Sequence, residues 1–508
     1  MASPTAPVPL PGADLACAAL AALARAELAS LAYPDRAWVP PAFGPSGQVV
    51  HDVLVVGGGQ SGLGLCAALR AQGVRNVLVV DRAPSGQEGV WDSFARMPEL
   101  RTPKALNGLD LGLPTLSVQR WYTARFGEGA WSAIDRIPRT AWMDYLRWYR
   151  ATLQLPVEND CEVTDVRQGL RSTDGDGRLL AVDTVRHGQR QTRLARLVVL
   201  ATGTDGAGAW RVPSFIADAL PADRRHHSSD LIDFGAMRGR RVAILGHGAS
   251  AFDNAVAALR AGAASVDLCF RRAALPRVNP HRHIETAGLM THYARLGDTT
   301  RWQVARHFRR VDQPPPRGSF HLALSMPGFA MHAGCGWNTV QWTGSEVAID
   351  TPRGRLLADH VICATGQQFD LAARPELRSL GPAVARWSDR YTPPASEADA
   401  GLAAHPYLGE HYEFLPRRPG GDDWVARVFA FNSASFVSHG PHSTSISGHK
   451  HALPRLVRGL TQRLFLDQEA TLVDELRRYD ETDLELPPDF EASQQQPHRF
   501  ATPAEAAA

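Results

Sequence analysis

Short runs of apolar residues, each followed by a glycine-rich turn, organise much of the chain. The run Val53–Val56 is followed by the turn Gly57-Gly58-Gly59-Gln60-Ser61-Gly62 and by a helical pattern over residues 63–72. Another apolar run, Val77–Val80, ends on Asp81. Uninterrupted apolar runs are typical of strands buried on both faces of a parallel sheet. The order strand, glycine turn, helix, strand and acid predicts a dinucleotide-binding βαβ unit.

The same order returns about 190 residues later. The strand pattern of Arg241–Leu245 leads into the turn Gly246-His247-Gly248-Ala249-Ser250-Ala251 and a further helical pattern. The next apolar strand, Val266–Phe270, is followed by Arg271-Arg272 and not by an acid. Two such units in one chain predict two nucleotide sites.

Two further apolar strands end in the same Ala-Thr-Gly sequence, at Leu197–Gly203 and His360–Gly366, on either side of the second unit. The simplest arrangement predicts an α/β fold of two Rossmann-like dinucleotide-binding domains, the second inserted into a discontinuous first domain. The expected boundaries are 1–50 for an N-terminal arm and helix, 51–205 and 350–470 for the first domain, 206–349 for the inserted domain, and 471–508 for a C-terminal extension. The end of that extension is rich in Gln, Pro and Ala, and we expect it to be disordered.

The first glycine turn has the residue types that a pyrophosphate requires. Gly57 permits the tight turn, Gly59 lets the backbone approach the phosphates, and Gly62 lets the helix pack close to the strand. The free N–H groups at the helix start, where Ser61 lies, favour negative charge. Asp81 can accept hydrogen bonds from the ribose hydroxyls.

The second turn repeats this register with Gly246, Gly248, Ser250 and Ala251. The pair Arg271-Arg272 stands where the ribose acid would be, and its charge suits a 2′-phosphate, which predicts NADPH over NADH. A solvated strand end would carry the same arginines. The ends of the two Ala-Thr-Gly strands complete the candidate cofactor-binding residues, and these are Thr202, Gly203, Thr365 and Gly366.

Composition and charge exclude several other classes of protein. Lysine and arginine exceed aspartate and glutamate by 54 − 52 = 2, so no overall field favours nucleic acid or an anionic membrane. No apolar run approaches the roughly 18 residues that a membrane span needs. The six cysteines are scattered without a CxxC pair, which argues against a disulfide framework, a zinc ribbon or a disulfide reductase. Since the N-terminal stretch also lacks a basic region before its apolar residues, we expect a cytoplasmic, reduced protein.

Candidate catalytic groups are fewer. Lys104 and Lys450 are the only lysines of the chain, and Lys104 could place a compact charge near a reacting group; a surface lysine is the alternative. His442 lies in a segment rich in Ser, Gly and His that suits a loop lining a site. This segment contains four histidines, His442 included, and histidine is a common metal ligand. Gly440-Pro441 breaks any helical face that they could share, and no thiol or carboxylate accompanies them, so we expect no metal site.

With these motifs in place, the chain resembles the class B flavoprotein monooxygenases over roughly residues 50–460. Gly89-Val90-Trp91 is similar to a G-x-W segment that lies near the flavin in that family, so Trp91 joins the candidate cofactor-binding residues. Leu100–Lys104 resembles the loop that follows, and Gly440–Ser443 resembles a C-terminal loop over the flavin edge. The family's linker fingerprint is degenerate, because Pro221 and Asp223 replace its Phe and Gly before His227.

The resemblance implies FAD in the first domain, NADPH in the inserted domain, and a monooxygenase that acts through a C4a-(hydro)peroxyflavin. One oxygen atom of O₂ would enter a small organic substrate, by N- or S-oxygenation or by Baeyer–Villiger insertion. The alternatives are an NADPH-dependent flavin reductase or dehydrogenase, and a flavin-binding protein without catalysis. The sequence leaves the substrate and the oligomeric state open.

Overall fold

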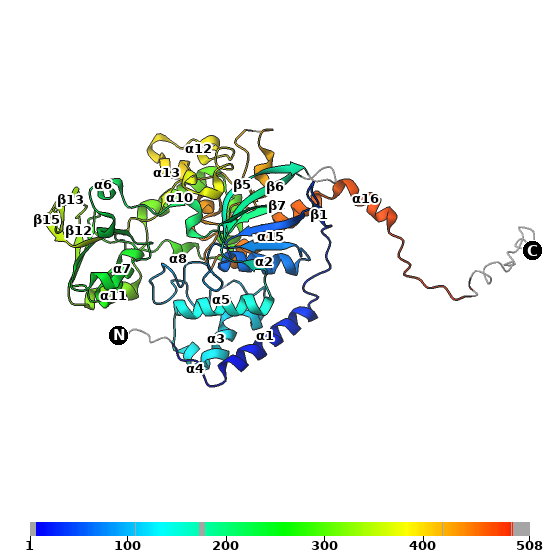
Figure 1. Ribbon diagram of the computed structural model, residues 1–508, viewed down its shortest axis with the longest axis horizontal. Coiled ribbons are helices and arrows are strands. Elements are labelled where there is room, and N and C mark those ends of the chain that lie inside the picture. The colour runs from blue at the N-terminus through cyan, green and yellow to red at the C-terminus, as the bar shows by residue number, and fades with distance from the viewer. Residues whose placement is uncertain (1–6, 107, 172–177, 419, 489, 491–508) are drawn as a thin grey trace, which may run out of the picture. The chain divides into compact units, whose positions relative to one another are not determined.

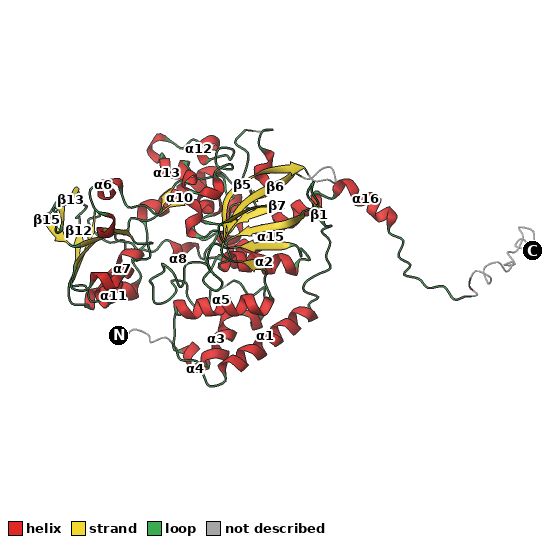
Figure 2. Ribbon diagram, in the orientation of Figure 1, coloured by secondary structure: helices red, strands yellow, loops and turns green. Residues whose placement is uncertain are grey.

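The fold is described from a computed structural model over residues 7–106, 108–171, 178–418, 420–488 and 490. The chain forms two units, residues 1–464 and 465–508 (Figure 1). The first unit contains a mixed sheet with a parallel centre and an entirely parallel sheet, and helices pack on both, in line with the predicted α/β class (Figure 2). The end of the C-terminal extension, for which the sequence predicts disorder, lies outside the described residues.

The first sheet has the strand order β4-β3-β2-β7-β6-β5, with β1 on β2 and β18 on β7. Its strands are β1 (Ala42–Phe43), β2 (Val49–Val56), β3 (Val77–Val80), β4 (Val157–Glu158), β5 (Cys161–Arg171), β6 (Arg178–Arg186), β7 (Gln189–Leu200) and β18 (Val428–Phe429). The pairs β2–β3, β2–β7, β3–β4 and β7–β18 are parallel, whereas β5, β6 and β7 form an antiparallel meander. The apolar run of β2 is buried on both faces because its alternate residues enter two separate cores.

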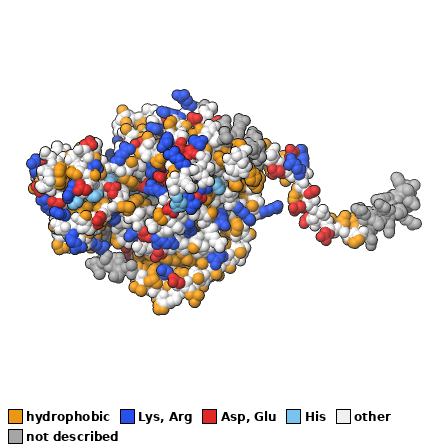
Figure 3. Space-filling model, viewed as in Figure 1, with side chains coloured by type: hydrophobic (Ala, Val, Ile, Leu, Met, Phe, Trp, Pro, Cys, Tyr) orange, Lys and Arg blue, Asp and Glu red, His pale blue; other side chains and the backbone are white. Residues whose placement is uncertain are grey.

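Helices cover the face of this sheet that carries Val53 and Val55. They are α1 (Ala13–Ser30), α2 (Gln60–Ala71), α3 (Val118–Phe126), α4 (Glu128–Ser132), α5 (Arg139–Leu153) and α15 (His449–Leu466). The expected N-terminal helix is thus α1, and it packs on α3 and α5 through Cys17, Leu20 and Ala24. Its outer face stays exposed, with Leu15 78% and Leu23 46% accessible, and hydrophobic side chains gather at this edge in Figure 3.

The second sheet is entirely parallel, in the order β12-β11-β10-β16-β9. Its strands are β9 (Arg225–His227), β10 (Arg241–Leu245), β11 (Ser265–Phe270), β12 (Phe329–Ala333) and β16 (His360–Cys363). Helices α7 (Ala249–Arg260) and α11 (Arg317–Ser325) pack on one face. An antiparallel sheet of β13 (Thr339–Trp342), β14 (Val347–Thr351) and β15 (Gly354–Ala358) packs on the other.

The structure moves one predicted domain boundary. The strand His360–Cys363 pairs with β10, so it belongs to the inserted domain, and the first domain cannot resume at residue 350. The chain crosses back after Gly366, where β17 (Gln368–Phe369) pairs with β8 (Gly208–Ala209) on the outgoing connection. An apolar strand that ends in Ala-Thr-Gly can belong to either of these two sheets, and its sequence alone does not indicate which sheet it joins.

Short helices complete both domains. They are α6 (Ser214–Ala217), α8 (His281–Ile284), α9 (Ala287–His292), α10 (Asp298–Val311), α12 (Trp387–Arg390), α13 (Ala400–Ala403) and α14 (Phe436–His439). Helix α10 packs on α13 and α14 through Trp302, Leu402 and Val437, and so ties the inserted domain to the second part of the first domain. The unit that begins at Phe465 contains α16 (Glu469–Arg478), an amphipathic helix with no buried residue. Within the described residues, no helix combines the length and apolar character needed to cross a membrane.

Arg96 joins the two domains through its guanidinium. It donates hydrogen bonds to the carbonyl oxygens of Phe94 at 2.6 Å and Ser228 at 2.9 Å, and to that of Asp230. It also lies 5.2 Å from the ring centre of Phe234. Because three carbonyls share one charged donor, this contact fixes a loop of the first domain against the linker into the second.

Arg96→Ala should lower the free energy of unfolding by about 1.5–3 kcal/mol, since charged hydrogen bonds at a half-buried site are lost. The control is Arg82→Ala, because Arg82 is 64% exposed and forms only a surface pair with Asp205. Urea unfolding followed by circular dichroism measures both. Equal, small losses for the two variants would contradict the assigned role.

Candidate functional site

The first glycine turn follows β2 and opens α2 in a geometry that only glycine permits. Gly57 has φ +109°, and a Cβ on it would lie 2.5 Å from the carbonyl oxygen of Ala201. A Cβ on Gly62 would lie 1.9 Å from the carbonyl oxygen of Gly57. No side chain caps the start of α2, so its first N–H groups face outward as donors for an anion. This turn fits a pyrophosphate, and the contacts of Gly57, Gly59 and Gly62 with one stay predictions.

Asp81 lies beside this turn at the end of β3. Its carboxylate accepts hydrogen bonds from the backbone N–H of Gly58 at 2.6 Å and of Ala83 at 2.7 Å. Burial raises the pKa of this carboxyl above its usual value, while the two N–H donors act in the opposite direction. The backbone thus fixes the orientation of the acid that the sequence predicts for the ribose.

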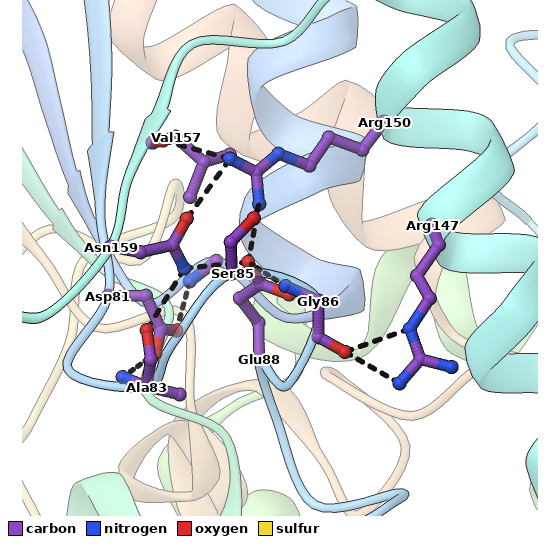
Figure 4. Close-up of polar contacts among 10 residues, drawn as sticks. Asp81, Ala83, Ser85, Gly86, Glu88, Arg147, Arg150, Val157 and Asn159 are labelled. Atoms are coloured by element: carbon purple, nitrogen blue, oxygen red, sulfur yellow. Dashed lines mark hydrogen bonds and ion pairs between the residues drawn. The ribbon is translucent and has the colours of Figure 1, made fainter.

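The sequence did not reveal the buried carboxylate of Glu88, which organises the loop above the turn (Figure 4). Glu88 accepts hydrogen bonds from Asn159 Nδ2 at 2.7 Å and from the Gly86 N–H at 3.1 Å, and it forms an ion pair with Arg150. Asn159 is 71 positions away in the chain, so no local pattern could have shown this cluster. The loop it holds brings the Cα of Gly89 to 3.6 Å from where a Cβ on Gly59 would lie.

A cavity of about 370 Å³ lies between this loop, α2 and α5. Its lining combines apolar side chains with the charged groups of the loop, and includes Gly58, Leu63, Glu88, Met143, Leu146 and Arg147. Arg147 donates to the Gly86 carbonyl oxygen at 2.8 Å and so closes the loop from the α5 side (Figure 4).

Two further contacts bring the C-terminal part of the first domain to the same turn. Thr202 Oγ1 accepts a hydrogen bond from Asn432 Nδ2 at 3.0 Å, and Gly203, at φ +62°, forms a bridge with Asn432. Ser61 Oγ lies 2.9 Å from His449 Nε2, so the start of α15 meets the start of α2. Trp91 is half-buried against the same hydrophobic core. The structure therefore brings Ser61, Thr202 and Gly203 to the same turn as Asn432 and His449.

The second glycine turn repeats the first. Gly246 has φ +139°, and a Cβ on it would lie 2.3 Å from the carbonyl oxygen of Ala364. No side chain caps α7, whose first turn contains Ser250 and the fully buried Ala251, and Gly248 immediately precedes this helix. The second turn fits a phosphate in the same way.

The structure corrects the position of the arginines by one residue. Gly246 N–H donates to the carbonyl oxygen of Cys269 at 2.9 Å, just as Gly57 N–H donates to Val80 at 2.8 Å. Cys269 therefore corresponds to Val80, and Phe270, not Arg271, corresponds to Asp81. The apolar run of the second strand extends one residue further, which hides this offset in the sequence.

The two arginines follow directly, at the rim of the second turn. Arg271 is exposed, and Arg272 donates to the Arg310 carbonyl oxygen at 3.0 Å. Thr365 and Gly366 come after β16 and Ala364, so they lie in the inserted domain beside the second turn and not beside the first.

His442 forms a pair with His281, which comes from α8 of the inserted domain. His442 Nε2 lies 3.1 Å from His281 Nδ1, and His442 Nδ1 lies 3.1 Å from Ser445 Oγ. Glu285 Oε1 lies 4.0 Å from His442 Nε2. Burial lowers the pKa of both imidazoles to about 4, so both rings are neutral near pH 7. Only one of the two facing nitrogens, Nδ1 of His281 or Nε2 of His442, carries the hydrogen between the rings.

Lys104, a catalytic candidate of the sequence analysis, lies against Trp131 of α4. Its ammonium donates to the Trp131 carbonyl oxygen at 2.7 Å and lies 5.1 Å from the centre of the Trp131 ring. These contacts anchor the loop to α4, and a catalytic role of Lys104 stays a prediction. Among the described residues, no cluster of three or more His, Cys, Asp or Glu side chains could hold a metal ion.

Glu88→Gln should weaken retention of the flavin, because the neutral amide cannot hold Arg150 and Asn159 together and the loop above the first turn relaxes. Glu376→Gln is the matched control, since Glu376 is also buried and ion-paired, with Arg374 at 2.8 Å, away from both turns. Gel filtration followed by the flavin-to-protein absorbance ratio measures retention. Full flavin content in the first variant would contradict the role of Glu88.

Comparisons with known proteins agree with this geometry. A family profile described as FAD-NAD(P)-binding matches residues 54–205. The fold is similar to that of an ornithine hydroxylase from Pseudomonas aeruginosa, with TM-score 0.64 and 21% identity over 82% of this chain and 100% of that one. It is also similar to an ornithine N-hydroxylase from Kutzneria, with TM-score 0.62 and 18% identity over 82% and 99% of the two chains.

One relative shares sequence identity with this chain over nearly its whole length. The sequence is 44% identical over 458 residues to the FAD-dependent urate hydroxylase of Xanthomonas campestris pv. campestris, which covers 90% of this chain and 95% of that protein. The predicted flavoprotein fold with two nucleotide-binding domains is confirmed. The predicted class of activity, an FAD-dependent monooxygenase, is confirmed as well. The chain belongs to the same family as that FAD-dependent hydroxylase.

Proposed function

We propose that this protein is a urate hydroxylase that uses FAD, NADPH and O₂. The observation that carries the proposal is the 44% identity to a urate hydroxylase, which extends over 95% of that enzyme. In the balanced reaction, one oxygen atom enters urate as a hydroxyl group and the other leaves as water. The nicotinamide nucleotide supplies two electrons and solvent supplies one proton.

The chain's own residues fit both cofactors. The first turn would hold the FAD pyrophosphate on the N–H groups of α2, with Asp81 at the ribose and the Glu88 loop above. The second turn would hold NADPH on α7, with Arg271 at the 2′-phosphate. FAD, when bound, accepts the electrons of the nicotinamide and activates O₂.

The His442–His281 pair supports a place for urate between the two domains. Around it lie the apolar side chains of Ile284, Leu289 and Met290 and the backbone of Gly440. The hollow that these residues line with His442 is about 10 Å³, room for a single water molecule, so urate would enter only after the two domains move apart. Ser445 Oγ–H donates to the His442 carbonyl oxygen at 3.1 Å, so its lone pair can accept the Nδ1–H of His442. In this tautomer, Nε2 of His442 is the acceptor, either of the His281 N–H or of a substrate proton.

We place the protein in the cytoplasm. All six cysteines are buried and unpaired, a state that a reducing compartment maintains.

His442→Gln should lower kcat for urate hydroxylation about 100-fold, because proton transfer by a positioned histidine is lost. Reduction of the flavin by NADPH in the absence of urate should remain. His405→Gln is the matched control, since burial also lowers the pKa of His405 to about 4, and its ring stacks on Phe369 at 3.8 Å, away from His442. Stopped-flow absorbance and the loss of urate give the two rates. If the wild-type enzyme with NADPH leaves urate unchanged, the proposed function is wrong.

Arg271→Ala should raise the KM for NADPH about 10- to 100-fold and leave the KM for NADH nearly unchanged, because only the phosphorylated nucleotide loses a charged partner. Arg353→Ala, an exposed arginine in the β14–β15 turn of the same domain, serves as the control. Initial rates of nucleotide oxidation provide both constants. Equal changes for the two nucleotides would refute the 2′-phosphate contact.

A further inference from the structure

A carboxylate reaches the second glycine turn from an element outside the βαβ unit. Asp312, the C-cap residue directly after α10, places Oδ2 at 3.1 Å from Nε2 of His247, the second residue of the turn. The side chain of Asp312 is 40% exposed and that of His247 is 19% exposed, so a ligand on the turn can reach both.

The two turns correspond residue by residue, so the contact of His247 with Asp312 can be compared with the contact of Gly58 with Asp81 in the first turn. Gly58 and His247 hold the same place, as do Asp81 and Phe270. In the first turn, the N–H of Gly58 donates to the strand-end carboxylate of Asp81 at 2.6 Å. In the second, the ring of His247 lies 5.8 Å from that of Phe270, and the strand end has no acid. The acid missing from β11 is therefore supplied beside the same turn position by α10.

The backbone of Asp312 is strained and firmly held. Its φ of 63° and ψ of −174° belong to a region that suits glycine. The N–H of Asp312 donates to the Phe308 carbonyl oxygen at 2.9 Å, its Oδ1 accepts from the Gln313 N–H at 2.8 Å, and the rigid sequence Pro314-Pro315-Pro316 follows. A strained residue fixed in this way commonly marks a functional position.

The charges around Asp312 act on a nucleotide in opposite directions. Burial acts to raise the pKa of Asp312, but the contact with His247 and the hydrogen bond from the Gln313 N–H lower it overall, so the group is an anion near pH 7. An anion accepts a hydrogen bond from a ribose 2′-hydroxyl and repels a 2′-phosphate. Arg272 is tied to α10 through the Arg310 carbonyl oxygen at 3.0 Å, which keeps the attracting and repelling groups at one rim.

We propose that Asp312 is the ribose carboxylate of the second nucleotide site and limits how strongly that site prefers a 2′-phosphate over a 2′-hydroxyl. The arginines at the rim attract the phosphate, and Asp312 offsets part of that attraction. The proposal deepens the nucleotide half of the proposed function and is independent of urate.

The test is calorimetric titration of the FAD-loaded enzyme, without urate, with adenosine 2′,5′-bisphosphate and with adenosine 5′-monophosphate. These probes differ only in the 2′-phosphate. In Asp312→Asn, the bisphosphate should bind about tenfold more tightly and the monophosphate no more tightly than in the wild type, because only the bisphosphate loses a repelling charge.

Asp312→Gly removes the same charge and also suits the positive φ, so it should fold at least as well as the wild type and shift the ratio of the two dissociation constants in the same direction. Asp267→Asn is the matched control, because Asp267 lies on β11 and contacts His332 at 2.8 Å away from the turn. An unchanged ratio in Asp312→Gly, or an equal change in the control, would overturn the proposal. Failure of urate hydroxylation with the expected ratio change would overturn only the proposed substrate.

Discussion

The whole arrangement depends on the close approach of a helix start to the preceding strand at two glycine turns. At the first turn the carbonyl oxygen of Gly57 occupies the space that a side chain on Gly62 would need, at 1.9 Å from its Cβ. Both helices begin without a capping side chain, which leaves N–H donors that must find a partner. A bound phosphate satisfies them, so the geometry that makes the turns intolerant of substitution is the geometry that binds nucleotides.

The candidate chemistry is assembled from segments that lie far apart in the chain. His281 and His442 are separated by 161 positions and belong to different domains. Arg96 of the first domain holds the linker to the second, and Arg101 reaches the buried Asp253 of α7 at 2.9 Å. Because these contacts cross between the domains, the site between them exists only when both domains are folded and correctly oriented.

The sequence predicted what depends on local spacing, and it failed where long-range packing decides. The strands, both turns and the acid Asp81 follow from consecutive residues, and the structure contains all of them. The sequence placed Arg271 at the position that corresponds to Asp81, but Phe270 holds that position. An apolar run does not reveal which of its residues pairs with the residue before the glycine turn. The sheet that receives His360–Cys363 and the contact of Lys104 with Trp131 depend on folding of distant segments. Glu88 was missed for the same reason, since its partner Asn159 is 71 positions away.

The most direct test of the account follows the oxygen atom. The purified enzyme is reduced with NADPH without oxygen, mixed with urate and dioxygen labelled with oxygen-18, and the product is analysed by mass spectrometry. The account predicts one labelled oxygen atom in each urate molecule consumed, with one NADPH oxidised for each. Oxidation of NADPH with release of labelled hydrogen peroxide and unchanged urate would contradict it.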